Sequence, residues 1–193
     1  MTDKDFWENR WQKGETGWDL HGVSPAIKKY IDTLTDKTLR ILIPGCGNAY
    51  EAEYLLQQGF THITVIDIAP SLTDALINKN KAAVEAGTLT VICGDFFAHQ
   101  GQYDLIIEQT FFCAISPTLR EAYAQHMNKL LAPNGKLVGL LFNTAFAGGP
   151  PFGGDIEEYF DYFEKHFGQV SMEPCEDSIA PRAGKEVWIT IGH

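Results

Sequence analysis

The chain has 193 residues and carries 15 Lys and Arg against 25 Asp and Glu, a net charge of −10 at pH 7. Such an acidic surface repels phosphate backbones, and no run of Lys or Arg appears, so we expect no nucleic-acid partner. Hydrophobic residues make up 45% of the chain, but no stretch approaches the roughly 18 apolar residues that a bilayer crossing needs, so we expect no membrane partner. The length suits a single domain over residues 1–193.

The four cysteines indicate a reduced, cytoplasmic protein. Cys46, Cys93, Cys113 and Cys175 form no C-x-x-C pair, and the six histidines show no metal-ligand spacing. Three of the cysteines lie in apolar runs, where a free thiol behaves as a small buried side chain. The first ten residues are charged and show no secretory signal. We therefore expect a cytoplasmic monomer without a metal.

Helices and strands alternate along the chain. Thr2 and Asp5 have the spacing of a capping box, and Ser24-Pro25 has the form of a helix start. The pattern predicts helices over 4–12, 25–33, 50–58, 70–86, 117–131 and 155–165. It predicts strands over 39–43, 62–66, 89–93, 103–107, 136–142, 169–172 and 186–191, with a turn at 133–135.

This alternation predicts an α/β fold with a Rossmann-like sheet of seven strands, flanked by helices. The sheet is expected to be mainly parallel, and the last two strands, which have no helix between them, to form a terminal antiparallel hairpin. Ligands of such sheets bind outside the carboxyl ends of the strands. The residues that follow each strand are therefore the candidates for ligand contacts.

The first two strands end in a pattern that suits an adenosine ligand. Gly45 and Gly47, on either side of Cys46, allow close approach of the backbone to a ligand. A dinucleotide-binding fingerprint would need a third glycine at the position of Tyr50. The absence of that glycine makes NAD a less favoured ligand than another molecule that contains adenosine. Asp67 ends the second strand and either binds ribose hydroxyls or caps the following helix; the glycine turn favours ribose.

Later segments leave two interpretations open. Asp95 and Phe96 follow the third strand, where the carboxylate either binds an adenine amino group or closes an Asx turn. Phe111 and Phe112 follow the fourth strand as a floor beneath a reacting group, although one of them is expected to be core. Trp7 and Trp11 share a helix face, which either docks on the core or covers a cation.

Six blocks in register resemble the thiopurine S-methyltransferase family of class I S-adenosylmethionine (SAM) methyltransferases, especially its thiol/halide branch. The match covers nearly the whole chain and keeps its order. The blocks are Phe6-Trp7-x3-Trp11-x2-Gly14-x-Thr16-x-Trp18-Asp19, Ile43-Pro44-Gly45-Cys46-Gly47, Gly94-Asp95-Phe96-Phe97, Phe111-Phe112-Cys113-Ala114-Ile115-x-Pro117-x2-Arg120, Gly148-Gly149-Pro150-Pro151-Phe152 and Pro181-Arg182-x-Gly184-x-Glu186.

The resemblance implies SAM as cofactor, S-adenosylhomocysteine (SAH) as product, and an N-terminal lid over residues 1–35. Gly45 would contact the methionine part, Asp67 the ribose, and Asp95 with Phe96 the adenine. The full set of implied cofactor-binding residues is Trp7, Trp11, Trp18, Gly45, Cys46, Gly47, Asp67, Ile68, Asp95, Phe96 and Gln109.

On the acceptor side, the resemblance implies contacts from Phe112, Arg120 and Phe152. Arg120 either reaches an anionic acceptor or forms a salt bridge on a helix surface. The chain departs from the branch at two places, since Glu108-Gln109 replaces a common Asp-Tyr and Phe152 replaces a common Tyr.

The predicted reaction is SN2 transfer of a methyl group from SAM to a small soft nucleophile, such as a thiol, a halide or a chalcogen anion. A thiolate or halide needs no base; for a neutral thiol, Glu108 is the nearest proton acceptor by sequence position. The alternatives are an O- or N-methyltransferase, a non-catalytic SAM-binding domain, and an NAD-dependent oxidoreductase, which Tyr50 disfavours.

Overall fold

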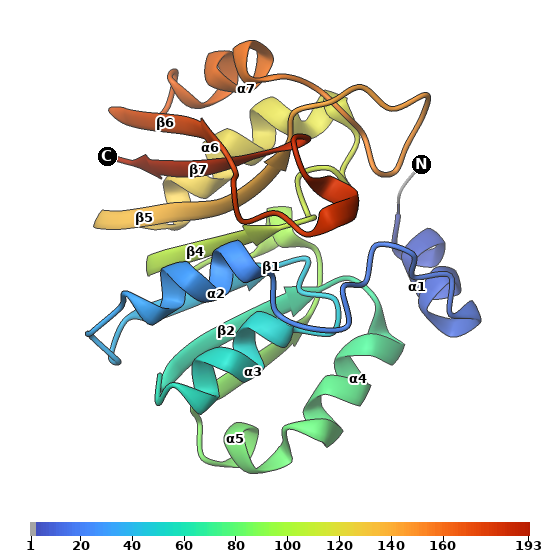
Figure 1. Ribbon diagram of the computed structural model, residues 1–193. Coiled ribbons are helices and arrows are strands. Elements are labelled where there is room, and N and C mark those ends of the chain that lie inside the picture. The colour runs from blue at the N-terminus through green and yellow to red at the C-terminus, as the bar shows by residue number, and fades with distance from the viewer. Residues whose placement is uncertain (1–2) are drawn as a thin grey trace.

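A computed structural model describes residues 3–193 (Figure 1). The helices are α1 (Lys4–Lys13), α2 (Pro25–Asp32), α3 (Tyr50–Gln57), α4 (Pro70–Lys79), α5 (Lys81–Glu85), α6 (Arg120–Leu130) and α7 (Ile156–Phe163), with the 3₁₀ turns η1 (Phe96–Ala98), η2 (Pro117–Leu119) and η3 (Ala180–Arg182). The strands are β1 (Arg40–Pro44), β2 (His62–Asp67), β3 (Leu89–Cys93), β4 (Tyr103–Gln109), β5 (Leu131–Phe142), β6 (Gln169–Pro174) and β7 (Glu186–Gly192).

The strands form one seven-stranded sheet in the order β3-β2-β1-β4-β5-β7-β6. The first five strands are parallel, while β7 is antiparallel to both β5 and β6. The predicted fold class and the terminal antiparallel hairpin are therefore confirmed. The order reverses between β1 and β4, and a ligand crevice is expected beyond the strand ends at that point.

The core has two layers, one on each face of the sheet. Along β1, Ile41 and Ile43 pack into the layer beneath α2, α3 and α4, while Leu42 packs into the layer beneath α6 and α7. This alternation follows from the period of two in a strand. Both faces are apolar because helices cover both (Figure 1).

Two expected elements differ in detail. The helix expected over 70–86 is broken at Asn80, whose side-chain amide donates to the carbonyl of Leu76 at 3.1 Å and so competes with the helix. The turn expected at 133–135 lies inside β5 as a bulge. The pairing with β4 jumps there from Tyr103↔Leu131 to Leu105↔Lys136.

The first helix is capped by a different residue from the one expected. Asp3 accepts a hydrogen bond from the Phe6 N–H at 3.1 Å, and Asp5 lies in the first turn. Thr2, the expected capping residue, lies outside the described residues. Helix α1 lies at the edge where β1 and β2 end, beside α4 (Figure 1).

Among residues 3–193, no helix combines the length and apolar composition that a membrane crossing needs.

Candidate active site

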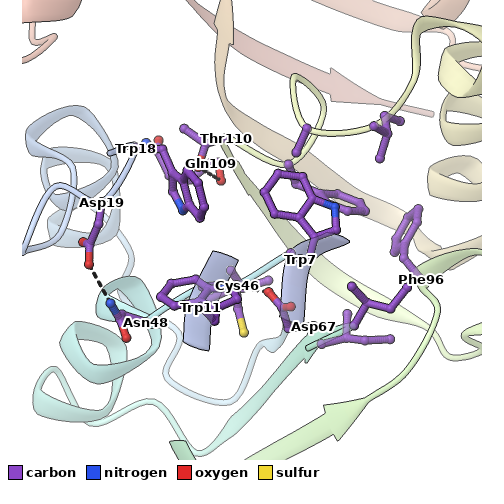
Figure 2. A pocket seen from close by; sticks show the side chains of 18 of the residues that line it. Trp7, Trp11, Trp18, Asp19, Cys46, Asn48, Asp67, Phe96, Gln109 and Thr110 are labelled. Carbon is purple, nitrogen blue, oxygen red and sulfur yellow. Dashed lines mark hydrogen bonds between the residues drawn. The ribbon is translucent and has the colours of Figure 1, made fainter. Parts of the chain in front are cut away.

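A cavity of about 430 Å³ lies at the carboxyl ends of β1 to β4, beneath the N-terminal segment. This volume is within the range of small-molecule sites. Figure 2 shows side chains from α1, from the turn after β1 and from the end of β4 facing one another across it. All eleven residues that the sequence assigned to the cofactor line this cavity.

The turn after β1 forms the floor of the cavity. Gly45 and Gly47 have φ values of +56° and +50°, which side-chain-bearing residues rarely adopt. The side chain of Phe111 covers Gly45, and the indole of Trp11 lies over Gly47. Phe111 and Trp11 thus pack directly against this turn, which only glycine allows, and the turn is part of the cavity lining.

Asp67 at the end of β2 accepts hydrogen bonds from two main-chain N–H groups and also lines the cavity. One carboxylate oxygen accepts from the Gly47 N–H and the other from the Ala69 N–H, each at 3.1 Å. The first bond fixes the glycine turn, and the second serves the start of α4. Burial raises the pKa of Asp67, against these hydrogen bonds. Its carboxylate still lines the cavity.

Asp95 likewise forms a local hydrogen bond and lines the cavity. Its side chain accepts from the Phe97 N–H at 2.9 Å, which is the Asx turn that the sequence left open. Asp95 is exposed and Phe96 is buried, and both line the cavity. The pair offers one polar contact and one aromatic face to a flat ring.

Three tryptophans form an aromatic cage at the top of the cavity. The rings of Trp7 and Trp18 are 5.4 Å apart, and those of Trp11 and Trp18 are 5.8 Å apart, both edge to face. All three are half-buried. Figure 2 labels them among the side chains that line the cavity. Indole faces attract cations, so this cage suits a positively charged ligand.

Polar contacts hold the cage over the sheet. Asp19 accepts from the Asn48 side-chain amide at 2.6 Å, and Figure 2 shows the two side chains pointing toward each other. Glu8 accepts from the Ser71 N–H at 3.1 Å, at the start of α4. Arg182 donates to the Trp18 carbonyl at 2.9 Å and pairs with Glu186 at 3.4 Å.

The charge of the cavity lining also favours a cation. Five carboxylate residues line the cavity, and Lys4 is its one Lys or Arg among the described residues. The carboxylates are Asp3, Asp19, Glu51, Asp67 and Asp95.

Burial raises the pKa of the Cys46 thiol well above its usual value, which keeps the thiol neutral. Within residues 3–193, no three His, Cys, Asp or Glu side chains gather as a metal site.

Gln109 supplies an unused hydrogen-bond acceptor. Its side-chain carbonyl oxygen is buried and has no hydrogen-bond partner among the described residues. A buried acceptor without a partner costs free energy, which a ligand donor would recover. The glycine floor, the carboxylates, the cage and this oxygen together fit SAM, whose sulfonium and ammonium groups are cationic.

Glu108 does not face the cavity, contrary to its predicted role as a proton acceptor. It is fully buried, and it accepts from the Phe111 and Phe112 N–H groups at 2.8 and 3.0 Å and from the Tyr123 hydroxyl at 2.5 Å. Burial raises its pKa to about 7, against these three hydrogen bonds. Its carboxylate holds the loop after β4 from below.

The three residues predicted on the acceptor side also lie elsewhere. Phe112 is buried in the core against Tyr123 and Tyr159, so Phe111 is the member of the pair that lines the cavity. Phe152 lines a separate shallow pocket formed by the loop over residues 143–155. Its N–H donates to the Cys113 carbonyl at 2.7 Å.

Arg120 forms a salt bridge, as one of the two interpretations predicted, but its guanidinium is buried and does not lie on the helix surface. It is 1% exposed, pairs with Glu158 at 2.8 Å, and donates to the carbonyls of Phe152 and Gly153 at 3.3 and 2.8 Å. Its guanidinium therefore fastens the loop before α7, and none of these bonds is available to an acceptor.

Replacing Arg120 with lysine is expected to lower the free energy of unfolding by about 1–2 kcal/mol, since an ammonium cannot reach Glu158 and both carbonyls at once. Denaturant unfolding measures the change. Arg40→Lys, in the exposed pair with Asp104, is the control and is expected to cost under about 0.5 kcal/mol. Equal losses in the two variants would contradict the assigned role.

Sequence reasoning missed several lining residues. Thr110 has φ of +60°, a left-handed turn that no glycine announces. Ile115 and Leu119 lie beyond this turn, where periodicity does not say which way they face. Asn48 and Asp19 are ordinary polar residues whose pairing only the folded chain shows. The motif that ends in Trp18-Asp19 was the one available signal.

The sheet order, the glycine turn after β1 and the acidic residue ending β2 define a class I SAM-dependent methyltransferase. A 1,6-didemethyltoxoflavin-N1-methyltransferase from Burkholderia thailandensis, solved with SAH, shares the fold with a TM-score of 0.72 at 15% identity, over 97% of this chain and 85% of that one.

Sequence comparison places the chain within this class. The family model described as thiopurine S-methyltransferase matches residues 2–190. A probable thiol methyltransferase 2 of Arabidopsis thaliana is 33% identical over 184 residues, covering 93% of this chain and 81% of the relative. A thiocyanate methyltransferase 1 of Brassica oleracea is 32% identical with the same coverage. The chain belongs to the thiopurine S-methyltransferase family, and it is a methyltransferase with SAM as its donor, as the resemblance predicted.

Proposed function

We propose that this protein transfers the methyl group of SAM to the sulfur of a small thiol or a similarly soft nucleophile by SN2 displacement. The observation that carries the proposal is the cavity itself, where the tryptophan cage, the glycine turn and Asp67 meet. Relatives named for thiol, thiocyanate and thiopurine methylation support sulfur as the accepting atom.

Different lining residues bind different parts of SAM. Asp67 binds the ribose hydroxyls, Asp95 and Phe96 bind the adenine, and the Gly45–Gly47 turn with Cys46 binds the methionine part. Ile68 packs beside the ribose, and the Gln109 oxygen accepts a donor of the ligand. When bound, SAM supplies a methyl group on a good leaving group. Trp7, Trp11 and Trp18 stabilise its positive charge through their indole faces.

Catalysis rests on orientation and on the exclusion of water. Holding the two reacting groups in line supplies up to about 7–11 kcal/mol of the barrier reduction. The lid residues Trp7 and Trp11 close the cavity toward solvent, which matters most for a strongly hydrated nucleophile. A thiolate requires no base, so this mechanism does not need a carboxylate at the reacting atoms.

Titration calorimetry with SAH is expected to show one-to-one binding at micromolar concentration. Asp67→Ala is expected to weaken this binding about 10- to 100-fold, because charge-assisted hydrogen bonds contribute about 1.5–3 kcal/mol. The control is Asp74→Ala, an exposed aspartate on α4 outside the cavity. No heat of binding at millimolar SAH would contradict the proposal.

We further propose that the chain acts as a monomeric single domain in the cytoplasm. The four free thiols support a reducing compartment, and the acidic net charge keeps copies apart. Sedimentation at micromolar concentration is expected to give the mass of one chain, 21.5 kDa. A dimer mass would contradict this.

A further inference from the structure

We propose that the preferred acceptor is a thiol with an uncharged, apolar substituent, and that the cavity disfavours thiols that carry a carboxylate. This inference rests on the proposed function, since it concerns the acceptor end of the same cavity. It commits to the chemistry of the substituent, which the family's range of acceptors leaves open.

The acceptor end lies on the β4 side of the cavity. Asp67 and Asp95 follow β2 and β3, which places the adenosine part toward that edge of the sheet. The remaining wall belongs to the segment after β4 and to the lid. Its apolar members are Phe111, Ala114, Ile115, Leu119 and Trp7, and the uncharged polar residues Gln109 and Thr110 line the cavity beside them.

The polar groups of this segment include no cation. The Thr110 hydroxyl donates to the main-chain carbonyl of Gln109 at 2.7 Å, and the side-chain oxygen of Gln109, which has no partner among the described residues, is an acceptor. Ile115 is 8% exposed. Leu119, at the rim of the cavity, is 40% exposed. A hydrocarbon substituent would bury this surface.

A negative substituent meets no free cation there. Arg120 and Arg182 are buried and neither lines the cavity. Arg120 binds Glu158 and the Gly153 carbonyl through its terminal nitrogens, while its buried Nε has no partner among the described residues. Arg182 donates to the Trp18 carbonyl. Lys4, at the exposed start of α1, is the one cationic lining residue among those described. Five lining carboxylate residues repel a further carboxylate, and burying an unpaired charge is costly.

Methyl transfer from SAM to such a thiol conserves atoms and charge. The thiol loses its proton to water, and the resulting thiolate attacks the methyl carbon. The new S–C bond forms from a sulfur lone pair while the S–C bond of the sulfonium breaks and its electron pair stays on the departing sulfur. The products are the methyl thioether and neutral SAH.

The test compares kcat/KM for 1-propanethiol and 3-mercaptopropionate, two thiols that differ in a carboxylate. We expect a preference of about 100-fold or more for propanethiol. Along the series from ethanethiol to butanethiol, kcat/KM is expected to rise about threefold to fourfold per methylene group. Equal rates for the pair, or a flat series, would overturn the inference.

A gain-of-function variant sharpens the test. Leu119→Lys places an ammonium at the rim and is expected to raise kcat/KM for 3-mercaptopropionate about tenfold. The control is Ile77→Lys, which introduces the same charge at a similarly exposed position, 37%, on α4 and outside the cavity. The control is expected to leave the preference unchanged, and a matching gain in it would overturn the inference.

SAH titration of each variant separates the two proposals. Normal SAH binding with equal use of both thiols overturns only this inference. Absence of SAH binding together with absence of methylation of any thiol overturns the proposed function. If 3-mercaptopropionate is preferred and Lys4→Gln abolishes that preference, Lys4 is an acceptor site and the inference is wrong.

Discussion

Substitution of Gly45 by alanine is expected to abolish measurable SAH binding and to lower the free energy of unfolding by about 2–5 kcal/mol. Alanine at φ of +56° is strained by about 1–2 kcal/mol. Its Cβ would also lie 2.9 Å from the Cβ of Phe111 and closer still to the ring, which adds about 1–3 kcal/mol of overpacking. Relief of this overlap moves either the glycine turn or Phe111, and both form the cavity.

The Gly87→Ala variant is a control that has the backbone strain of a positive φ without the steric overlap that Gly45→Ala creates with Phe111. Gly87 has φ of +72°, but a Cβ there meets nothing within 4 Å, and the residue is not part of the cavity lining. This control is expected to cost about 1–2 kcal/mol and to bind SAH normally. Denaturant unfolding and calorimetry measure both quantities. Normal SAH binding by Gly45→Ala would show that the turn tolerates a side chain.

Glu108→Gln is expected to remove a pH dependence of stability without removing activity. The pKa of Glu108 is about 7 in the folded protein against 4.5 ordinarily, so the native state keeps a proton that the unfolded chain releases. The stabilisation is complete below pH 4.5 and is lost as pH rises through about 7. The difference corresponds to about 3 kcal/mol.

Free energies of unfolding at pH 5, 6, 7 and 8 test whether stability falls as pH rises. The wild type is expected to lose about 3 kcal/mol more than Glu108→Gln across that range, whereas Glu164→Gln, at an exposed position, is expected to follow the wild type. Thiol methylation by Glu108→Gln is expected to stay within about threefold of the wild type, because the amide oxygen still accepts from the loop N–H groups. A loss of about 100-fold that is confined to high-pKa thiols would instead make Glu108 a base.

The sequence was sufficient for the sheet and for the cofactor side of the cavity. Glycine and proline mark the strand ends, and parallel strands bring the residues after them to one edge. It was insufficient after β4, where the chain turns at Thr110. Glu108 and Phe112 face the core on either side of that turn, while Gln109 and Phe111 face the cavity. The left-handed backbone conformation of Thr110 determines which of these side chains face the cavity. The periodicity of the sequence does not predict that conformation.

Arg120 shows a second limit of sequence reasoning. Its partner Glu158 and the carbonyls of Phe152 and Gly153 lie more than 30 positions along the chain. An arginine on a helix is ordinarily read as a surface residue, since Arg is rarely buried without a partner. Only the tertiary fold brings these partners around the guanidinium.

The hydrogen bond from Arg182 to the Trp18 carbonyl has a consequence for the order in which the protein matures during synthesis. The residues that line the cavity lie between positions 3 and 119, so they leave the ribosome long before Arg182 does. Until η3 and β7 emerge, the lid has its tryptophans but not this anchor. A nascent chain therefore contains every lining residue of the cavity before the segment that anchors the Trp18 carbonyl is made.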